Sequence, residues 1–199
     1  MNYLRDITTL KNRYFAMRHG QSESNVMRIL VTEPANGING YGLTEFGRKQ
    51  TEESIKRNKF LDKGTIIYSS DFKRAEETAE IARGVLKASP VNLEKKLRER
   101  CFGIFEKTSI SNYEKVWAED RINPNSKRYG AESANEVLNR VTSLIFELEK
   151  KYSEKNILLV SHGDPIQILT ISFMKEEISK HIDLKFIGNA EIRELKLKK

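Results

Sequence analysis

The chain has one cysteine, four prolines and no long apolar run among its 199 residues. Cys101 cannot form an intramolecular disulfide, which excludes the disulfide scaffold of small secreted domains. The longest apolar stretch, Ile166 to Met174, is interrupted by polar residues and is too short to span a bilayer. The N-terminal residues MNYLRDITTLKNRY lack the apolar segment of a signal peptide. These absences predict a cytoplasmic protein with no membrane partner.

The sequence also lacks a proline-, glycine- or serine-rich tract that would separate two halves. It has no internal repeat, which excludes a solenoid or a propeller. A chain of this length can bury a substantial core as one unit. We therefore expect a single domain over residues 1–199.

Acidic residues are fewer than basic ones, so the formal net charge is +7. A basic chain can attract nucleic acid or small anions. Here lysines alternate with glutamates over most of the length, as on ordinary solvated surfaces, and lysines are crowded only at the C-terminus. A nucleic-acid partner is therefore not predicted, and the sequence makes no prediction of oligomeric state.

Three short apolar segments each end in a polar turn. They are Arg13 to Met17 before RHG, Thr65 to Tyr68 before SSD, and Asn156 to Val160 before SHGDP. Their length and apolar character predict buried strands. Ile192 to Leu197 alternates apolar and charged residues, which predicts an edge strand.

Helical patterns lie between the predicted strands. Thr44 is the predicted N-cap of the helical pattern over 43–60, and Asp71 is the predicted N-cap of the next one. Ser133 and Glu136 form a capping box, and Asp164 is the predicted N-cap before Pro165. Strands that alternate with helices indicate an α/β fold, in which helices cover both faces of a mostly parallel sheet.

The ends of the three strands carry the residues of chemical interest. Arg18 and His19 follow the first strand. Arg74 lies in the first turn of the helix after the second strand, and His162 follows the third. Because ligands bind beyond the carboxyl ends of strands in such sheets, we expect two guanidiniums and two imidazoles at one rim.

This cluster is typical of a phosphate site. Guanidinium groups match phosphate oxygens in pairs, and fixed donors stabilise the charge of a phosphoryl transition state. A neutral imidazole can supply the nucleophile near neutral pH. His19 is the candidate, because Gly20 lets the backbone and the substrate approach closely. We expect His181, which follows no strand, to be structural.

Other hydrolase chemistries lack their residues. A cysteine phosphatase needs an arginine six residues after the cysteine, and Lys107 stands there after Cys101. No H-x-x-x-H or C-x-x-C spacing supports a zinc site, and GINGYGL does not continue as a P-loop. Ser22 and Ser161 lie in no G-x-S-x-G elbow. Neither a metal nor a cofactor is predicted.

Six motifs occur in a fixed order along the chain: RHGQSESN, LTEFGRKQ, YSSDFKRAEETA, LRERCFG, AESANEVLNRV and VSHGD. This order resembles the histidine phosphatase superfamily, in its phosphoglycerate mutase-like branch, over roughly residues 13 to 165. The resemblance implies a three-layer α/β/α sandwich. It implies that His19 is the phosphorylated nucleophile, that Arg18, Arg74 and the catalytic His162 bind phosphate, and that Asn25 adds a hydrogen bond.

Glu99, in LRERCFG, matches the carboxylate that protonates the leaving oxygen and later deprotonates water. A carboxyl beside a bound phosphate is expected to have a raised pKa, which suits a general acid. Glu23 and Glu106 are the other carboxylates that could face the pocket. The loop Val31 to Gly42 departs from the family pattern and is expected, with the segment after Gly103, to contact the alcohol half of the substrate.

The resemblance implies a metal-independent phosphatase that hydrolyses small phosphate monoesters through a phosphohistidine on His19. Its expected partner is a small phosphorylated metabolite. A phosphoglycerate mutase is the alternative, and the compact interval from Glu99 to His162 favours hydrolysis over this transfer. A non-catalytic phosphate-binding module is a third hypothesis, which the intact histidines and arginines disfavour.

Overall fold

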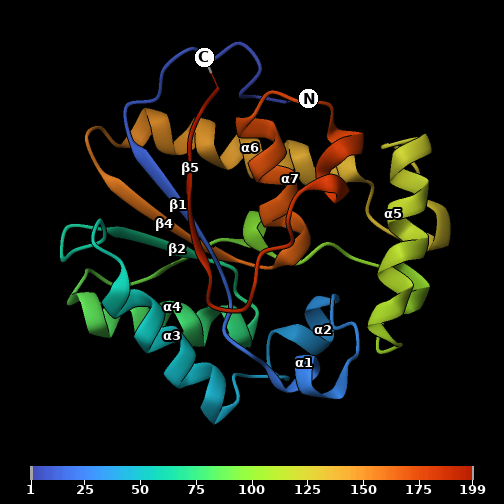
Figure 1. The fold of residues 1–199 in the computed structure, drawn as a ribbon, viewed down its shortest axis with the longest axis horizontal. Helices are drawn as coiled ribbons and strands as arrows, with labels where there is room; N and C mark the ends of the chain where they lie inside the picture. The colour runs from blue at the N-terminus through green and yellow to red at the C-terminus, as the bar shows by residue number, and fades with distance from the viewer. Residues whose placement is uncertain (1, 199) are drawn as a thin grey trace.

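A five-stranded sheet forms the centre of the protein, whose residues 2–198 are described by a computed structural model (Figure 1). Its strands are β1 (Arg13–Arg18), β2 (Ile66–Ser69), β3 (Asn92–Leu93), β4 (Asn156–Ser161) and β5 (Ile192–Leu195). Their spatial order is β3-β2-β4-β1-β5, and only β5 runs antiparallel to its neighbour. The predicted α/β fold with a mostly parallel sheet is confirmed, as is the edge strand. The sequence did not predict β3.

The register of the central strands brings the predicted turns together. Arg18 of β1 is paired with Ser161 of β4, and Ser69 of β2 is paired with Val160. The three strands therefore end at one edge of the sheet. The polar residues that follow each strand start from this common edge.

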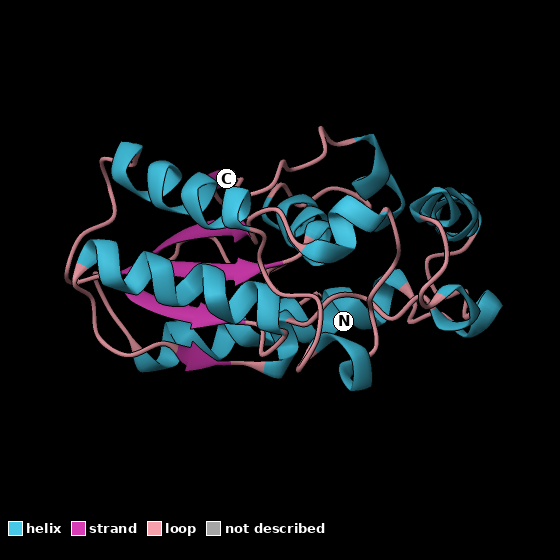
Figure 2. Cartoon of the chain, turned by 90° about the horizontal axis from the view of Figure 1, so that it is seen from below, coloured by secondary structure: helices cyan, strands magenta, loops and turns pink. Residues whose placement is uncertain are grey.

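Helices cover both faces of the sheet and complete three layers (Figure 2). The helices α3 (Glu45–Arg57) and α4 (Lys73–Leu86) cover one face, and α6 (Ala134–Lys151) and α7 (Gly163–Phe173) cover the other. Phe15 and Met17 of β1 belong to the core under α3 and α4, whereas Tyr14 and Ala16 belong to the core under α6 and α7. This alternation is the period of a strand buried on both sides. The three-layer sandwich is confirmed.

Two predicted helix starts are confirmed by their caps. The Thr44 side chain accepts a hydrogen bond from the Gly47 N–H at the start of α3, and Ser133 and Glu136 form the capping box of α6. Among the helices of residues 2–198, none combines the length and apolar character needed to span a bilayer.

The two aspartate caps predicted from the sequence are wrong. Phe72 is the residue that precedes α4. The Asp71 carboxylate instead accepts hydrogen bonds from Arg98 Nε–H at 2.7 Å and Arg98 Nη2–H at 2.5 Å. α7 begins at Gly163, so Asp164 lies inside its first turn and is fully buried. In both cases a distant arginine takes the carboxylate that local sequence assigned to a helix terminus.

Short helices form a cap beyond the carboxyl end of β1 (Figure 1). They are α1 (Glu23–Met27), α2 (Pro34–Gly37) and α5 (Tyr113–Ile122). The 3₁₀ helices within residues 2–198 are η1 (Lys95–Leu97), η2 (Gly103–Phe105), η3 (Ile110–Asn112), η4 (Arg128–Gly130) and η5 (Ile178–Asp183). A small separate core of Leu30, Phe102, Phe105, Val116 and Ala131 joins the segments of this cap.

Two glycines let α3 pack closely on the turn after β1. A Cβ atom at Gly47 would lie 2.0 Å from the Gln21 carbonyl oxygen, and one at Gly20 would lie 2.5 Å from the Gly47 carbonyl oxygen. The Thr44 N–H also donates to the Gln21 carbonyl oxygen, at 3.0 Å. Because His19 directly precedes Gly20, this contact fixes the end of β1.

Replacing Gly47 with alanine should lower the free energy of unfolding by about 1–3 kcal/mol, because the new methyl group would overlap a main-chain oxygen. Gly84→Ala in α4 is the control, since nothing lies within 4 Å of the added Cβ apart from its own helix. Alanine there should stabilise the helix by roughly 0.5–1 kcal/mol. Urea denaturation measures both changes. Equal stability of the two variants would contradict the tight contact.

Candidate active site

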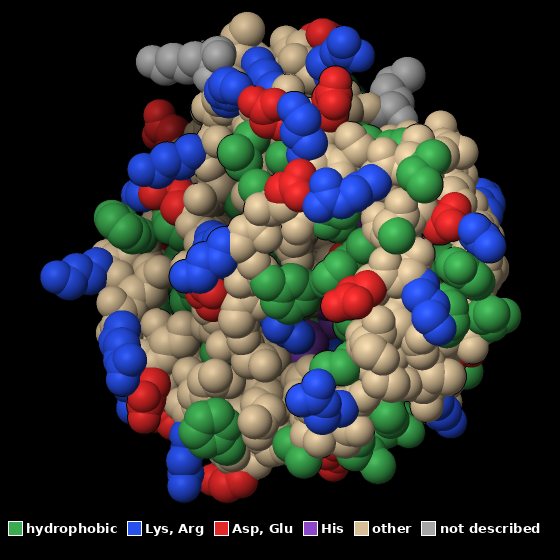
Figure 3. Space-filling view, turned by 45° about the vertical axis from the view of Figure 1, so that its right-hand side comes forward, with side chains coloured by type: hydrophobic (Ala, Val, Ile, Leu, Met, Phe, Trp, Pro, Cys, Tyr) green, Lys and Arg blue, Asp and Glu red, His purple; other side chains and the backbone are tan. Residues whose placement is uncertain are grey.

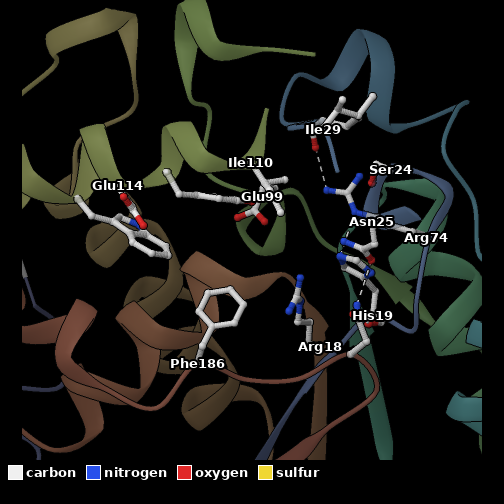
Figure 4. Close-up of a pocket in the computed structure, with 14 residues that line it drawn as sticks. Arg18, His19, Ser24, Asn25, Ile29, Arg74, Glu99, Ile110, Glu114 and Phe186 are labelled. Carbon is white, nitrogen blue, oxygen red and sulfur yellow. Dashed lines mark hydrogen bonds between the residues drawn. The ribbon is translucent and has the colours of Figure 1, made fainter. Parts of the chain in front are cut away.

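A cavity of about 450 Å³ opens between the carboxyl edge of the sheet and the cap. It is lined by Arg18, His19, Ser24, Asn25, Ile29, Val31, Arg74, Glu99, Ile110, Tyr113, Glu114, Trp117, Phe186 and Asn189. Figure 3 shows a hollow on this face with a histidine side chain at its floor, and Figure 4 shows the lining side chains. Of the six site residues predicted from the sequence, all but His162 line this cavity.

His19 is buried at the end of β1, with 2% of its surface exposed. Its Nδ1–H donates to the Gly20 carbonyl oxygen at 2.8 Å, which leaves Nε2 as the unprotonated nitrogen. Nε2 accepts a hydrogen bond from Arg74 Nε–H at 3.1 Å. Burial, followed by the charges of Arg74 and Arg18, holds the pKa of His19 well below its usual 6.5. The imidazole is therefore neutral at pH 7, with a lone pair on Nε2.

Arg74 is a buried cation and Arg18 a partly buried one, and each donates to a main-chain carbonyl. Arg18 Nη1–H donates to the Ile187 carbonyl oxygen and Arg74 Nη2–H to that of Val31, both at 2.9 Å. Arg18 Nε and Arg74 Nη1 are buried without a hydrogen-bond partner. Burial lowers the pKa of Arg74 to about 10, so it is charged at pH 7. Buried donors without acceptors are costly, and the oxygens of an anion would satisfy them.

His162 lies directly behind His19, with ring centroids 5.1 Å apart and ring planes at 62°. Its Nε2 is 2.9 Å from Ser70 Oγ at the end of β2, and its Nδ1 has no partner. Burial and the charge of Arg74 hold the pKa of His162 well below 6.5. The sheet therefore brings the two predicted imidazoles together, one at the cavity surface and one below it.

Asn25 lines the cavity from α1. Its side-chain oxygen accepts hydrogen bonds from the Ser22 N–H and from Asn189 Nδ2–H, each at 3.0 Å. The NH₂ group of Asn25 is then the part of the amide left for a ligand. Asn189 also donates to the His19 carbonyl oxygen at 3.1 Å. The sequence did not single out Asn189, which is distant from both partners along the chain.

Glu99 is the buried carboxyl of the cavity, with 6% of its surface exposed. Its Oε1 accepts the Arg100 main-chain N–H at 2.9 Å. Burial, and then the negative charge of Asp164, raise the pKa of Glu99 to about 7. A carboxyl with this pKa can both give and take a proton near neutral pH.

The other two candidate carboxylates do not line the cavity. Glu23 is exposed on α1. Glu106 Oε2 accepts hydrogen bonds from the N–H and the Oγ–H of Thr32, both at 2.8 Å, and so ties down the start of the loop Val31 to Gly42. Within this loop, Val31 lines the cavity. Glu106 also accepts hydrogen bonds from the Glu33 N–H and the Asn36 side chain, so the expected contact of this loop with the alcohol stays a prediction that concerns Val31.

A buried ionic network lies behind Glu99. The Arg100 guanidinium donates to both oxygens of Asp120, at 2.6 and 2.9 Å, and to Asp164 Oδ2 at 3.1 Å. Asp164 Oδ1 accepts the Trp117 Nε1–H at 2.8 Å. His181 Nε2 lies 3.2 Å from Asp120 Oδ2, so His181 is a buried structural residue, as predicted. Asp164 does not cap α7 because it helps to neutralise Arg100.

Several cavity residues were missed by the sequence analysis. Ile110, Tyr113, Trp117 and Phe186 supply apolar and aromatic surface from η3, α5 and the segment before β5. Tyr113 and Trp117 are one turn apart on α5, and this spacing of two aromatic residues was the local signal that they share one face of a helix. As expected, the segment after Gly103 contributes to the cavity.

Cys101 lies outside the residues that line the cavity, and burial raises the pKa of its thiol, which makes it a poorer nucleophile. Within residues 2–198, no group of three or more His, Cys, Asp or Glu side chains is placed to hold a metal ion.

Comparison with known proteins identifies the class. The model of the histidine phosphatase superfamily (branch 1) matches residues 14–199. A broad-specificity phosphatase of Saccharomyces cerevisiae is 33% identical over 173 residues, which cover 83% of this chain and 71% of the yeast protein. Phosphoglycerate mutase-like protein 4 of Arabidopsis thaliana is 28% identical over 159 residues, which cover 77% and 67% of the two chains.

A solved structure of a phosphoserine phosphatase from Entamoeba histolytica has a TM-score of 0.73 to this chain at 24% identity. The match covers 91% of this chain and 88% of that one, and it supports the fold. The chain therefore belongs to the histidine phosphatase superfamily, branch 1. The predicted family and enzyme class, a histidine phosphatase, are confirmed.

The Arg100 network should contribute strongly to stability. Asp120→Ala should lower the free energy of unfolding by about 3 kcal/mol or more, because it leaves a fully buried guanidinium short of one of its two carboxylates. Asp183→Ala is the control. It removes the partner of Arg121 in a pair that is about half exposed, and should cost less than about 1 kcal/mol. Equal losses in chemical denaturation would contradict the difference between the two pairs.

Proposed function

We propose that this enzyme hydrolyses small phosphate monoesters through a phosphohistidine formed on His19. The observation that carries the proposal is a neutral imidazole whose unprotonated nitrogen lies beside guanidinium groups that each have one buried, unsatisfied donor. These groups match the oxygens of a phosphate dianion. We expect the enzyme to act in the cytoplasm, on phosphorylated metabolites.

In the first step, the substrate phosphate lies between Arg18 and Arg74, with Asn25 as a further donor and the unpartnered Nδ1 of His162, below the cavity surface, as the remaining one. Nε2 of His19 forms a bond to phosphorus while the bond from phosphorus to the ester oxygen breaks. Glu99 gives its proton to the departing alcohol oxygen. The guanidinium groups stabilise the charge that spreads over the phosphoryl oxygens.

In the second step, the ionised Glu99 takes a proton from water. The water oxygen forms a bond to phosphorus, and the bond from phosphorus to Nε2 breaks. Inorganic phosphate leaves, and Glu99 and His19 return to their starting states. A carboxyl whose pKa is about 7 suits both the donating and the accepting role.

Arg74 has a further task in this cycle. Its Nε–H donates to His19 Nε2, the nitrogen that would attack phosphorus, so this hydrogen bond must open before the imidazole can react. Phosphate oxygens would draw the guanidinium away, since a charge-assisted hydrogen bond to an anion is stronger than one to a neutral nitrogen. Substrate binding and release of the nucleophile are thereby coupled.

The phosphoglycerate mutase alternative requires transfer of the phosphoryl group to a second ester oxygen. Such activity would depend on priming by a bisphosphorylated sugar acid, which distinguishes it from release of inorganic phosphate. The non-catalytic alternative predicts no turnover at all. Phosphate release from a panel of metabolite monoesters in the presence of a chelator separates the three functions.

The wild type should release phosphate in this assay, whereas His19→Ala should lose activity by at least about 10³-fold, because it removes the nucleophile. His181→Ala, which removes a histidine outside the cavity, is the control and should retain turnover in its folded fraction. Circular dichroism checks the fold of both variants. Comparable phosphate release by His19→Ala would contradict the assignment.

Trapping of the intermediate identifies the nucleophile directly. Enzyme quenched during turnover of a radiolabelled ester should keep its label in alkali and lose it in acid, as a phosphoramidate does. His19→Ala should carry no label. A label that is stable in acid and lost in alkali would indicate an acyl phosphate on a carboxylate instead.

The pKa of Glu99 sets the alkaline side of the pH profile. Because Glu99 must be protonated to donate, kcat/KM should fall as the pH rises through about 7. His19 is neutral down to well below pH 6.5, so it should not limit activity near neutral pH. Glu99→Gln should lower kcat by roughly 10²–10⁴-fold for alkyl esters and remove this alkaline limb.

Glu23→Gln is the matched control, because Glu23 is exposed and outside the cavity. It should keep the wild-type profile. The loss in Glu99→Gln should also be smaller for p-nitrophenyl phosphate, whose alcohol leaves without a proton. An alkaline limb that persists in Glu99→Gln would assign the titration to another group.

A further inference from the structure

The cavity has two chemically different ends. His19, Arg74 and Asn25 lie at one end in Figure 4, and Phe186 and Glu114 lie at the other, with Glu99 between them. The first end contains the groups that the proposed function assigns to the phosphate. The second end must then face the alcohol half of a substrate.

The second end is an aromatic wall. The Tyr113 and Trp117 rings are stacked, with centroids 5.2 Å apart and planes at 25°, and Phe186 lies 6.1 Å from Trp117. Phe186 is 38% exposed, and Tyr113 and Trp117 are partly exposed. Covering this surface with an apolar group would release water from it and is favourable.

The wall is fixed before a ligand binds. The Trp117 indole N–H is satisfied by Asp164 inside the protein, at 2.8 Å, so the ring has a set orientation. The Phe102 and Tyr113 rings pack nearly perpendicular to each other, with centroids 4.6 Å apart and planes at 84°. Gly163 leaves room for Phe186, since a Cβ atom there would lie 2.6 Å from its ring. A preformed surface loses little conformational entropy on binding.

The wall is also close to the phosphate end. The Arg18 guanidinium carbon lies 4.9 Å from the centroid of the Phe186 ring. An ester whose phosphate oxygens contact Arg18 would therefore place its first carbons beside Phe186.

Charge at the second end opposes an anionic alcohol. Arg18 and Arg74 are the only cations among the described residues that line the cavity, and both face the phosphate. The remaining ionisable side chains of the lining are Glu114 and Glu99, and Glu99 carries a proton when the ester binds in the proposed mechanism. A carboxylate or a second phosphate on the alcohol would be partly desolvated beside Glu114, with both guanidinium groups already bound to the reacting phosphate, which selects against it.

We infer that the preferred substrates are phosphate monoesters of uncharged apolar alcohols, with an aromatic ring as the group that the wall fits best. The inference rests on the proposed phosphatase function and adds the chemical class of the leaving alcohol. Phe186 and Trp117 are its specificity-determining residues.

The test compares 2-phenylethyl phosphate with ethyl phosphate. Both release a primary alcohol, so the reactivity of their ester bonds is similar and the phenyl ring is the difference. Burial of the ring against the wall should raise kcat/KM for 2-phenylethyl phosphate by roughly 10- to 100-fold. Glycerol 3-phosphate and 3-phosphoglycerate differ at one group, which is a hydroxymethyl in the first and a carboxylate in the second. The kcat/KM for glycerol 3-phosphate should be the higher of the two.

Phe186→Ala should reduce the preference for 2-phenylethyl over ethyl phosphate by about tenfold, because part of the wall is removed. Phe146→Ala is the matched control, since Phe146 is 37% exposed on α6, outside the cavity lining, and should leave the preference unchanged. The preference is a ratio within one protein sample, so partial unfolding of a variant does not affect it.

Each outcome bears on a separate proposal. Equal kcat/KM for the two alkyl esters, or a preference for 3-phosphoglycerate, would overturn the aromatic assignment and leave the phosphatase function intact. A strong preference for phosphocholine over both would overturn it in favour of a cation held by Glu114 and the rings. No turnover of any ester would overturn the phosphatase proposal itself, and the inference with it.

Discussion

The placement of Arg18 and Arg74 around His19 is the constraint on which the site depends. Arg74 is buried and Arg18 partly buried; each donates to one main-chain carbonyl, Arg74 also donates to His19, and each keeps one buried donor without an acceptor. Such burial lowers stability unless an anion supplies the missing oxygens. Burial, together with the charges of Arg74 and Arg18, also suppresses protonation of His19. The same arrangement therefore supports both the proposed phosphate binding and the proposed role of His19 as a nucleophile.

Arg100 shows how the same chain buries an arginine for structure. Asp120 and Asp164 neutralise it completely, with no surface left exposed. Asp164 connects this network to the cavity in two ways: it raises the pKa of Glu99, and it orients the Trp117 ring. The buried network thus contributes to the raised pKa of Glu99 and fixes the aromatic wall, although none of its charged groups lines the cavity.

Most of the fold, and five of the six candidate residues that the structure gathers at the cavity, could be predicted because their signals are local. An apolar strand followed by RHG or SHGD places a histidine at the sheet edge, and Thr44 and Ser133 mark helix starts through bonds within one turn. Asp71 and Asp164 have the same local appearance, yet distant arginines bind them. Asn189 and Phe186 belong to no motif. They line the cavity because the segment that leads into β5 passes the carboxyl end of β1. Tertiary contacts of this kind leave no periodicity in the sequence.

The distribution of charge bears on the choice between hydrolysis and transfer. A mutase must hold a phosphorylated sugar acid in place while the phosphoryl group returns to it, so it needs cations for the carboxylate and the second phosphate as well as for the reacting one. In this cavity Arg74 lies at one end, Arg18 lies between it and Phe186, and the aromatic rings with Glu114 form the other end, where no further cation lines the cavity among the described residues. An apolar alcohol could leave such a surface once its bond to phosphorus is broken, whereas in the proposed second step water needs only Glu99 and the phosphorylated His19. The asymmetry that selects the alcohol therefore also favours water as the final acceptor.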